Sequence, residues 1–270
     1  MSKIKKLIGE VSTFLLDMDG VLYIGDTPIE GAAKTVAYLK SKGKKIIFMT
    51  NNSANTRRAY VQKLARMSIA VQISDILTSG YVTMLYLRER VPRARVYVVG
   101  ESGLKKEMMN GGFKVLTDRR VEEADFVVVG LDRTLSYKKL TAGVRALLAG
   151  AEMIATNMDT IYPTEGGISP GAAATVGALS ASSCKQPKVV IGKPSPFMIR
   201  LALSIVGSRP SDAAIVGDKL STDILAGTRF GLKTILVLSG VTSKYDIKKI
   251  KAEKMPDLVV PSIKSLMVGK

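Results

Sequence analysis

Short apolar stretches alternate with amphipathic stretches along most of the chain. The first apolar stretch, Val11 to Leu16, is followed by Asp17 and Gly20, which is typical of a buried parallel strand. Segments with a helical spacing of apolar residues include 28–43, 57–67, 136–148 and 172–182. Further apolar runs separate them, at 45–50, 95–100, 126–130, 153–157, 189–191, 213–216 and 234–238. This alternation predicts an α/β fold built on a parallel sheet.

Local signals mark where some of these elements begin and end. Pro28 is expected to open a helix that Gly43 ends, and Ser136 is expected to cap the N-terminus of a later helix. The segment 157–171 is rich in proline and glycine and is expected to form a long loop. A structureless loop of this length in a compact domain is usually a lid or a binding loop.

The composition removes several classes of enzyme. The chain has 270 residues and no histidine, which excludes a Ser-His-Asp triad, a histidine phosphatase and a His-ligated zinc site. The single cysteine, Cys184, allows no internal disulfide, and Val190 stands where a cysteine phosphatase needs arginine. We expect a cytoplasmic protein, because no apolar run approaches the ~18 residues of a membrane span and no signal peptide is visible.

The net charge of +17 is the unusual global property of the chain. Lysine and arginine are spread through every helical segment, which favours the interpretation of a solvated, soluble surface. A field that attracts anionic substrates and a face that binds nucleic acid are the two alternatives. Because aromatic residues make up 6% of the chain and tryptophan is absent, a base-stacking nucleic-acid module is disfavoured.

Two carboxylates, Asp17 and Asp19, stand two positions apart at the end of the first predicted strand. Open α/β sheets bind their ligands at the carboxyl ends of their strands. Burying two anions side by side costs free energy unless a cation lies between them, and Mg2+ is the commonest hard dication. The pair therefore indicates metal-assisted phosphoryl chemistry, although aspartate and glycine are also ordinary turn residues.

Three further motifs follow predicted strands, where a ligand site at the same sheet edge would need them. Thr50-Asn51-Asn52-Ser53 offers a hydroxyl and successive backbone N–H groups to an oxyanion. Gly192-Lys193-Pro194-Ser195-Pro196 presents a lysine on a stiff backbone. Gly217-Asp218 adds a third carboxylate, which Asp223 can support one helical turn later. Taken singly, each motif is equally well read as helix capping or as a surface turn.

Together and in this order, the four motifs resemble the haloacid dehalogenase (HAD) superfamily of phosphohydrolases with an aspartate nucleophile. The resemblance implies that Asp17 is the nucleophile and that Asp19 is the general acid and base. It implies one Mg2+ cofactor, held by Asp17, Asp218 and the backbone carbonyl of Asp19, with Asp223 as a supporting carboxylate. The residues that it places on the transferring phosphoryl group are Thr50, Asn51, Asn52 and Lys193.

The resemblance extends over essentially the whole chain. The long insertion between Thr50 and Lys193 resembles the C2-type α/β cap, and the segments 157–171 and 192–196 resemble the NagD-type, 4-nitrophenylphosphatase/phosphoglycolate phosphatase branch. The implied fold is a doubly wound, Rossmann-like parallel sheet formed by residues 1–79 and 188–270, with an inserted cap at 80–187. The leaving-group contacts expected from the cap are Asp132, Asn157, Asp159 and Tyr162.

The expected function is Mg2+-dependent hydrolysis of small phosphomonoesters through an aspartyl-phosphate intermediate. A large cap over the site favours a small phosphorylated metabolite as the substrate. One alternative is a phosphotransferase or phosphomutase that uses the same nucleophile. The other is a basic nucleic-acid-binding protein with a vestigial site. The assembly state, a homodimer included, is left open.

Overall fold

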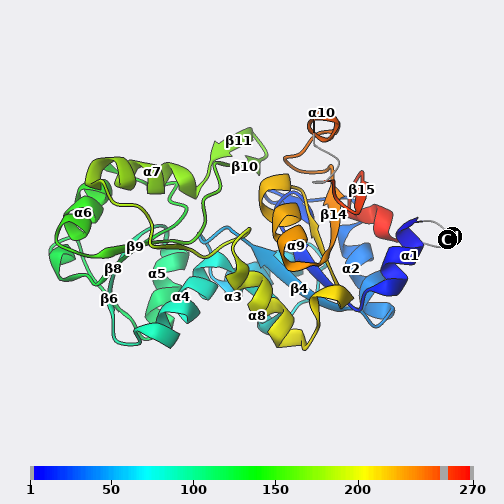
Figure 1. Ribbon diagram of the computed structural model, residues 1–270, viewed down its shortest axis with the longest axis horizontal. Coiled ribbons are helices and arrows are strands. Elements are labelled where there is room, and N and C mark those ends of the chain that lie inside the picture. The colour runs from blue at the N-terminus through cyan, green and yellow to red at the C-terminus, as the bar shows by residue number, and fades with distance from the viewer. Residues whose placement is uncertain (1–2, 250–254, 268–270) are drawn as a thin grey trace.

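The computed structural model describes residues 3–249 and 255–267. Figure 1 shows an elongated molecule in which the middle of the chain forms one lobe and both terminal parts form the other. The helices and strands in chain order are α1 (Lys3–Glu10), β1 (Thr13–Asp17), β2 (Tyr23–Ile24), β3 (Thr27–Pro28), α2 (Ala32–Ser41), β4 (Lys45–Thr50), α3 (Arg57–Arg66), β5 (Ile76–Thr78), α4 (Ser79–Arg90), β6 (Arg95–Val99), α5 (Ser102–Asn110), β7 (Lys114–Val115), β8 (Phe126–Val129), α6 (Tyr137–Leu148), β9 (Glu152–Ala155), β10 (Ile161–Thr164), β11 (Gly167–Pro170), α7 (Ala172–Ser183), β12 (Val189–Val190), α8 (Pro196–Val206), β13 (Ala213–Gly217), the π-helical turn η4 (Leu220–Ile224), α9 (Leu225–Phe230), β14 (Lys233–Val237), α10 (Lys244–Lys248) and β15 (Leu258–Val260).

The lobe formed by the two terminal parts, which we call the core, is built on a six-stranded parallel sheet. Its strand order is β15-β14-β13-β1-β4-β5. The central strand β1 pairs Leu16 with Val216 of β13 and with Phe48 of β4. Because the order runs outward from β1 in both directions, the sheet is doubly wound, and its switch point lies between β1 and β13. Ligands of such sheets bind beyond the carboxyl ends of the strands at this point.

The other lobe, which we call the cap, contains a second parallel sheet of five strands in the order β12-β9-β8-β6-β7. Both sheets are also marked by runs of apolar, mostly β-branched residues, as strands buried on two faces require. The predicted fold class is confirmed: a doubly wound parallel core sheet and a separate α/β cap. Val189–Val190 pairs with Ile154–Ala155, so β12 belongs to the sheet of the cap.

Core and cap share one continuous hydrophobic cluster. Leu15 and Ile47 of the core sheet belong to the same cluster as Val96 and Ile154 of the cap sheet. The helices α4 and α8 contribute Val82 and Ile199 to it. Burial of apolar surface across the junction therefore holds the two lobes together.

Two short hairpins correct the sequence analysis. Thr27–Pro28 forms β3 and pairs with β2, so the helix expected to open at Pro28 begins only at Ala32, after Gly31 with φ +81°. The segment 157–171, expected to be a structureless loop, contains the antiparallel hairpin β10–β11, which turns through Gly166. The capping prediction for Ser136 is correct, since its Oγ accepts the N–H of Lys139 at 3.3 Å.

Within residues 3–249 and 255–267, no helix has the length and apolar character needed to cross a bilayer.

Candidate active site

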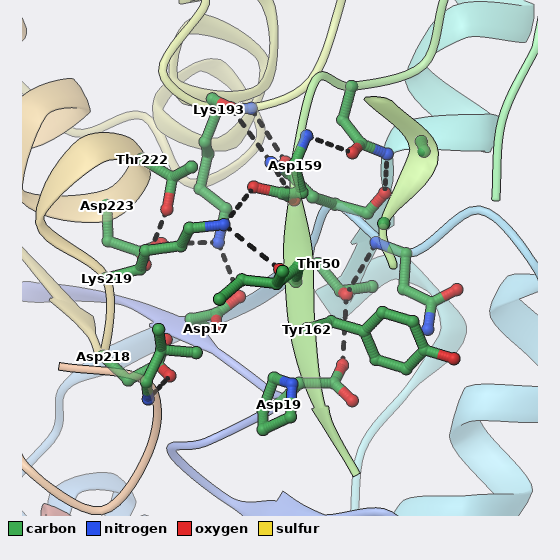
Figure 2. A pocket seen from close by; sticks show the side chains of 18 of the residues that line it. Asp17, Asp19, Thr50, Asp159, Tyr162, Lys193, Asp218, Lys219, Thr222 and Asp223 are labelled. Atoms are coloured by element: carbon green, nitrogen blue, oxygen red, sulfur yellow. Dashed lines mark hydrogen bonds and ion pairs between the residues drawn. The ribbon is translucent and has the colours of Figure 1, made fainter. Parts of the chain in front are cut away.

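Asp17 and Asp218 emerge side by side at the switch point of the core sheet. Asp17 is the last residue of β1, and Asp218 directly follows β13. Asp223 comes from η4, one turn of π-helix that begins two residues after Asp218, and such turns are frequent at functional sites. Figure 2 shows the three side chains converging on one side of a pocket.

The three carboxylates form a buried cluster with one ammonium group. One oxygen each of Asp17, Asp218 and Asp223 lies within 4.8 Å of the others. The Nζ atom of Lys193 lies 2.5 Å from Asp17 Oδ1 and 2.6 Å from Asp223 Oδ1. Burial opposes the charge of Lys193, but the two carboxylates outweigh burial and hold its pKa well above the ordinary value.

The negative charge in this cluster exceeds the positive charge. Burial raises the pKa of Asp17 well above its usual range, although Lys193 opposes the shift. Burial, assisted by Asp223, raises the pKa of Asp218 to about 7. Among the described residues, Lys193 is the one cation that forms an ion pair with any of the three carboxylates. Such a set of oxygen donors with unbalanced charge fits a small divalent cation such as Mg2+.

Two glycines make room for the carboxylate of Asp218. A Cβ atom at Gly20, which has φ +78°, would lie 2.3 Å from Asp218 Oδ2, and one at Gly240 would lie 1.9 Å from it. The same oxygen accepts the backbone N–H of Val241 at 2.6 Å. Asp218 is therefore oriented by the backbone of the loop after β14, at a place where no side chain fits.

Asp19 lies at the other side of the pocket, two residues beyond the end of β1 (Figure 2). Its Oδ2 accepts hydrogen bonds from the hydroxyls of Tyr23 at 3.3 Å and Thr50 at 3.4 Å. Burial raises the pKa of Asp19, while Lys63 and the two hydroxyl groups act in the opposite direction. A carboxyl group with a raised pKa holds a proton more readily, as a general acid must.

Asn51 connects three parts of the site. Its Oδ1 accepts the N–H of Lys193 at 2.8 Å, and its Nδ2 donates to Lys193 O at 2.9 Å and to Asp159 Oδ2 at 3.0 Å. Its backbone carbonyl accepts Nδ2 of Asn157 at 2.7 Å. Asn51 thus fixes two segments: the loop of the core that carries Lys193, and residues 157–159, which lead to β10.

The pocket lies between the edge of the core sheet and the hairpin β10–β11. Its core side is lined by Asp17, Asp19, Thr50, Asn51, Asn52, Lys193, Asp218, Lys219, Thr222, Asp223 and Val241. Its cap side is lined by Leu131, Asn157, Asp159, Ile161, Tyr162, Pro163, Gly171 and Ala172. All predicted site residues except Asp132 therefore meet here, from segments far apart in the sequence.

Comparisons with known proteins agree with this geometry. Family models described as haloacid dehalogenase-like hydrolase and HAD-hydrolase-like match residues 14–114 and 190–266. The acid sugar phosphatase of Staphylococcus epidermidis is 37% identical over 235 residues, which are 87% of this chain and 89% of that protein. The chain belongs to the haloacid dehalogenase superfamily.

Solved structures show to which family within the HAD superfamily this chain belongs. The p-nitrophenyl phosphatase from Archaeoglobus fulgidus is 37% identical with a TM-score of 0.86, and the similarity covers 94% of this chain and 97% of that one. The 4-nitrophenylphosphatase from Thermotoga maritima is 33% identical with a TM-score of 0.89, and here the shares are 96% and 97%. The predicted membership of the NagD/p-nitrophenyl phosphatase family with a C2 cap is confirmed.

One predicted contact of this HAD chain is not in the pocket. The side chain of Asp132 is fully buried, and its oxygens accept hydrogen bonds from Lys139 Nζ at 2.9 and 2.7 Å and from Thr134 Oγ1 at 2.7 Å. Asp132 is thus engaged within the cap and does not line the pocket where the sequence analysis expected it. The neighbouring Leu131 lines the pocket instead.

Lys219 is a pocket residue that the sequence analysis missed. It follows Asp218 directly, and its Nζ lies 2.9 Å from Asp159 Oδ1 in the cap. In the sequence it looks like one of 40 scattered basic residues, and the signal that could have found it is its position next to a strand-end carboxylate.

Proposed function

We propose that this HAD phosphatase hydrolyses small phosphomonoesters with the help of Mg2+, through an aspartyl-phosphate on Asp17. The observation that carries the proposal is the placement of Asp17 and Asp19 in one pocket, with Lys193 and the carboxylates on one side and hydroxyl groups on the other. A nucleophile, a proton donor and charge-balancing groups are the parts that phosphoryl transfer requires.

The residues divide the reaction into two steps. In the first, a carboxylate oxygen of Asp17 forms a bond to phosphorus, the bond to the leaving alcohol breaks, and Asp19 gives its proton to the alcohol oxygen. In the second, Asp19 takes a proton from water as that water attacks phosphorus, which releases inorganic phosphate and restores Asp17. Lys193 and the hydroxyl of Thr50 balance charge on the phosphoryl oxygens.

Mg2+ would be held by the carboxylates of Asp17 and Asp218 and the backbone carbonyl of Asp19, with Asp223 as a supporting carboxylate. When bound, the ion acts as a Lewis acid that neutralises charge on the phosphoryl oxygens. Lys193, shared by Asp17 and Asp223, keeps these carboxylates in place beside the ion.

Sugar phosphates are the substrate class that we favour. A hollow beyond Asp19, adjoining the pocket, is lined mainly by polar side chains, among them Asn52, Asn55, Gln62 and Lys63. Such side chains offer hydrogen bonds to a hydroxylated leaving group. The name of the Staphylococcus epidermidis relative, acid sugar phosphatase, supports the same choice, whereas the name of the Archaeoglobus fulgidus relative refers to p-nitrophenyl phosphate.

We also propose the cap boundaries and the cell compartment. The segment 80–187 is our proposed cap insertion; the strand β12, which directly follows it, still pairs with β9 of the cap sheet before the chain returns to the core. Cys184 is an exposed free thiol, which fits a reducing compartment, and we propose the cytoplasm.

The function is tested by measuring phosphate release from a panel of metabolites with Mg2+, with Ca2+ and with excess EDTA. Because a metal ion supplies several kcal/mol of transition-state stabilisation, EDTA should lower kcat/KM at least about 100-fold, and Mg2+ should restore it. Ca2+ should not, since it prefers more ligands and a looser geometry. Mg2+ should also raise Tm. Full activity in EDTA would contradict the metal proposal, and transfer to an added sugar instead of water would favour a phosphotransferase.

Tyr162→Ala tests the role of the hairpin in substrate choice. Tyr162 lines both the pocket and the adjoining hollow, so its ring forms part of the wall that meets the leaving group. We expect KM for a sugar phosphate to rise about tenfold, and the KM for p-nitrophenyl phosphate to change less. The two KM values are compared with those of Tyr245→Ala, a control at an exposed tyrosine of α10. Equal changes for both substrates would show that Tyr162 does not select the leaving group.

A further inference from the structure

The carboxylate of Asp159 is held by two residues of the core, although Asp159 itself belongs to the cap side of the pocket. Its Oδ1 lies 2.9 Å from Nζ of Lys219, and its Oδ2 accepts Nδ2 of Asn51 at 3.0 Å. Lys219 follows Asp218 after β13, and Asn51 follows Thr50 after β4. One cap carboxylate therefore bridges two strand ends of the catalytic sheet (Figure 2).

Lys219 also holds the first residue of the hairpin. Its Nζ donates to the backbone carbonyl of Ile161 at 3.2 Å, and Ile161 begins β10 directly before Tyr162. The side chains of Lys219 and Asp159 are only 16% and 17% exposed, so solvent screens their attraction less than that of a surface pair. The base of the hairpin is thus fixed by a shielded ion pair and a hydrogen bond from a single ammonium group.

The tip of the hairpin is held more loosely. Glu165 accepts hydrogen bonds from the N–H of Asp26 at 3.0 Å and from the hydroxyl of Thr27 at 2.9 Å, both on the hairpin β2–β3 of the core. These contacts are exposed, and exposed contacts contribute little to stability. The position of Tyr162 over the pocket therefore depends mainly on the base.

We propose that Lys219 is a positioning residue: through Asp159 and the carbonyl of Ile161 it sets the hairpin β10–β11 over the pocket and so aligns the leaving-group wall with Asp17 and Asp19. This assignment rests on the proposed phosphatase function. It gives Asp159 a new role, since both of its carboxylate oxygens are engaged by core residues. It also makes the loop that carries Asp218 the place where the cap is aligned with the catalytic core.

The test compares Lys219→Met, Lys219→Arg, Asp159→Asn and the double variant Lys219→Met/Asp159→Asn. For a sugar phosphate, Lys219→Met should raise KM about tenfold, which is within the range of interaction energies measured for residues in contact. The rise in KM for p-nitrophenyl phosphate should be several-fold smaller. Lys219→Arg, which keeps the charge, should recover most of the loss. The double variant should be no worse than the worse single variant, because both substitutions remove one connection.

A second measurement does not need activity. If Lys219 fixes the hairpin, Lys219→Met should be cut faster by glutamyl endopeptidase after Glu165, at the exposed tip of the hairpin, in the folded protein, while Lys219→Arg should be cut at nearly the wild-type rate. Lys188→Met is the matched control, because it breaks an exposed ion pair with Glu152 at the strands β12 and β9, and it should alter neither KM nor cleavage.

Each outcome decides the assignment. An equal loss of kcat on both substrates, additive effects in the double variant and unchanged cleavage after Glu165 would show that Lys219 acts directly on the phosphoryl group, and the positioning role would be wrong. A wild-type protein that releases phosphate from no substrate would contradict the proposed function. Faster cleavage of Lys219→Met would still support the alignment of the hairpin in that case.

Discussion

Asp17→Asn is expected to lower the rate of phosphate release by about 10⁴–10⁶-fold, because an amide cannot serve as the nucleophile in the first step. The substitution also removes one charged oxygen donor of the proposed metal site and one partner of Lys193. The side chain keeps its size, and Lys193 keeps Asp223, so the fold should be retained.

The stability of the metal-free protein gives an independent check on the same variant. Folding raises the pKa of Asp17, so in the unfolded chain this group binds a proton less readily than in the native state. A carboxyl group of this kind costs free energy of folding at neutral pH, where it would be ionised in the unfolded chain. Without Mg2+, Asp17→Asn should therefore show a Tm at pH 7 equal to or above that of the wild type, whereas added Mg2+ should stabilise the wild type more.

Rates are measured as phosphate release at saturating substrate, and acid-quenched samples are tested for phosphate bound to the protein. Asp118→Asn is the control, since Asp118 is a partly exposed carboxylate that pairs with Lys138 in the cap. Asp118→Asn should retain the wild-type rate and the phosphate bound to the protein. An Asp17→Asn protein with more than about a tenth of the wild-type rate would exclude covalent catalysis through this residue.

The core of the fold could be predicted because its signals are local. Strands buried on both faces must be apolar, so the stretches that became β1, β4, β13 and β14 are visible in the sequence. Parallel strands also share one carboxyl edge, so a carboxylate at the end of β1 and another directly after β13 were expected to meet there. Asp17 and Asp218 do so, because β1 and β13 are paired neighbours.

The hairpins were missed because their strands are too short for periodicity to show. The strands β10 and β11 have four residues each, and each includes a proline, so the segment resembles a loop. The strands β2 and β3 have two residues each, and Pro28 in β3 imitates the start of a helix. The glycine pair Gly166-Gly167 between two short runs was the available hairpin signal.

The partners of the two cap aspartates could not be predicted, because a carboxylate in the sequence does not reveal the residue that it pairs with. Asp132 and Asp159 both follow strands of the cap by a few residues. Asp132 forms an ion pair with Lys139, seven positions later in the same lobe, and the side chain of Asp132 is buried there. Asp159 forms an ion pair with Lys219, which lies sixty positions away in the core. Only the arrangement of the lobes decides which of two similar residues reaches the pocket.

Asp19→Asn should have the second-largest effect, and its size should depend on the leaving group. An asparagine cannot give a proton to the departing oxygen, and loss of general acid catalysis typically costs about 10²–10⁴-fold. A sugar phosphate, whose alkoxide leaves poorly, should show this full loss in the first step. The nitrophenolate of p-nitrophenyl phosphate leaves without a proton, so the loss with that substrate should be about tenfold in the rate of the first step.

The structure makes the comparison a test of proton transfer alone. The hydroxyls of Tyr23 and Thr50 donate to Asp19 Oδ2, and the Asn oxygen can accept the same two bonds, so the side chain should keep its place. The first step is followed by rapid-quench release of the leaving group in a single turnover, which separates it from the second step. Asp118→Asn again serves as the control, because Asp118 is a partly exposed carboxylate of the cap that lines neither the pocket nor the adjoining hollow. Equal losses with both substrates would mean that Asp19 orients water or metal but does not protonate the leaving alcohol. A loss at least tenfold larger with the sugar phosphate than with p-nitrophenyl phosphate would establish the proton transfer on which the two-step hydrolysis depends.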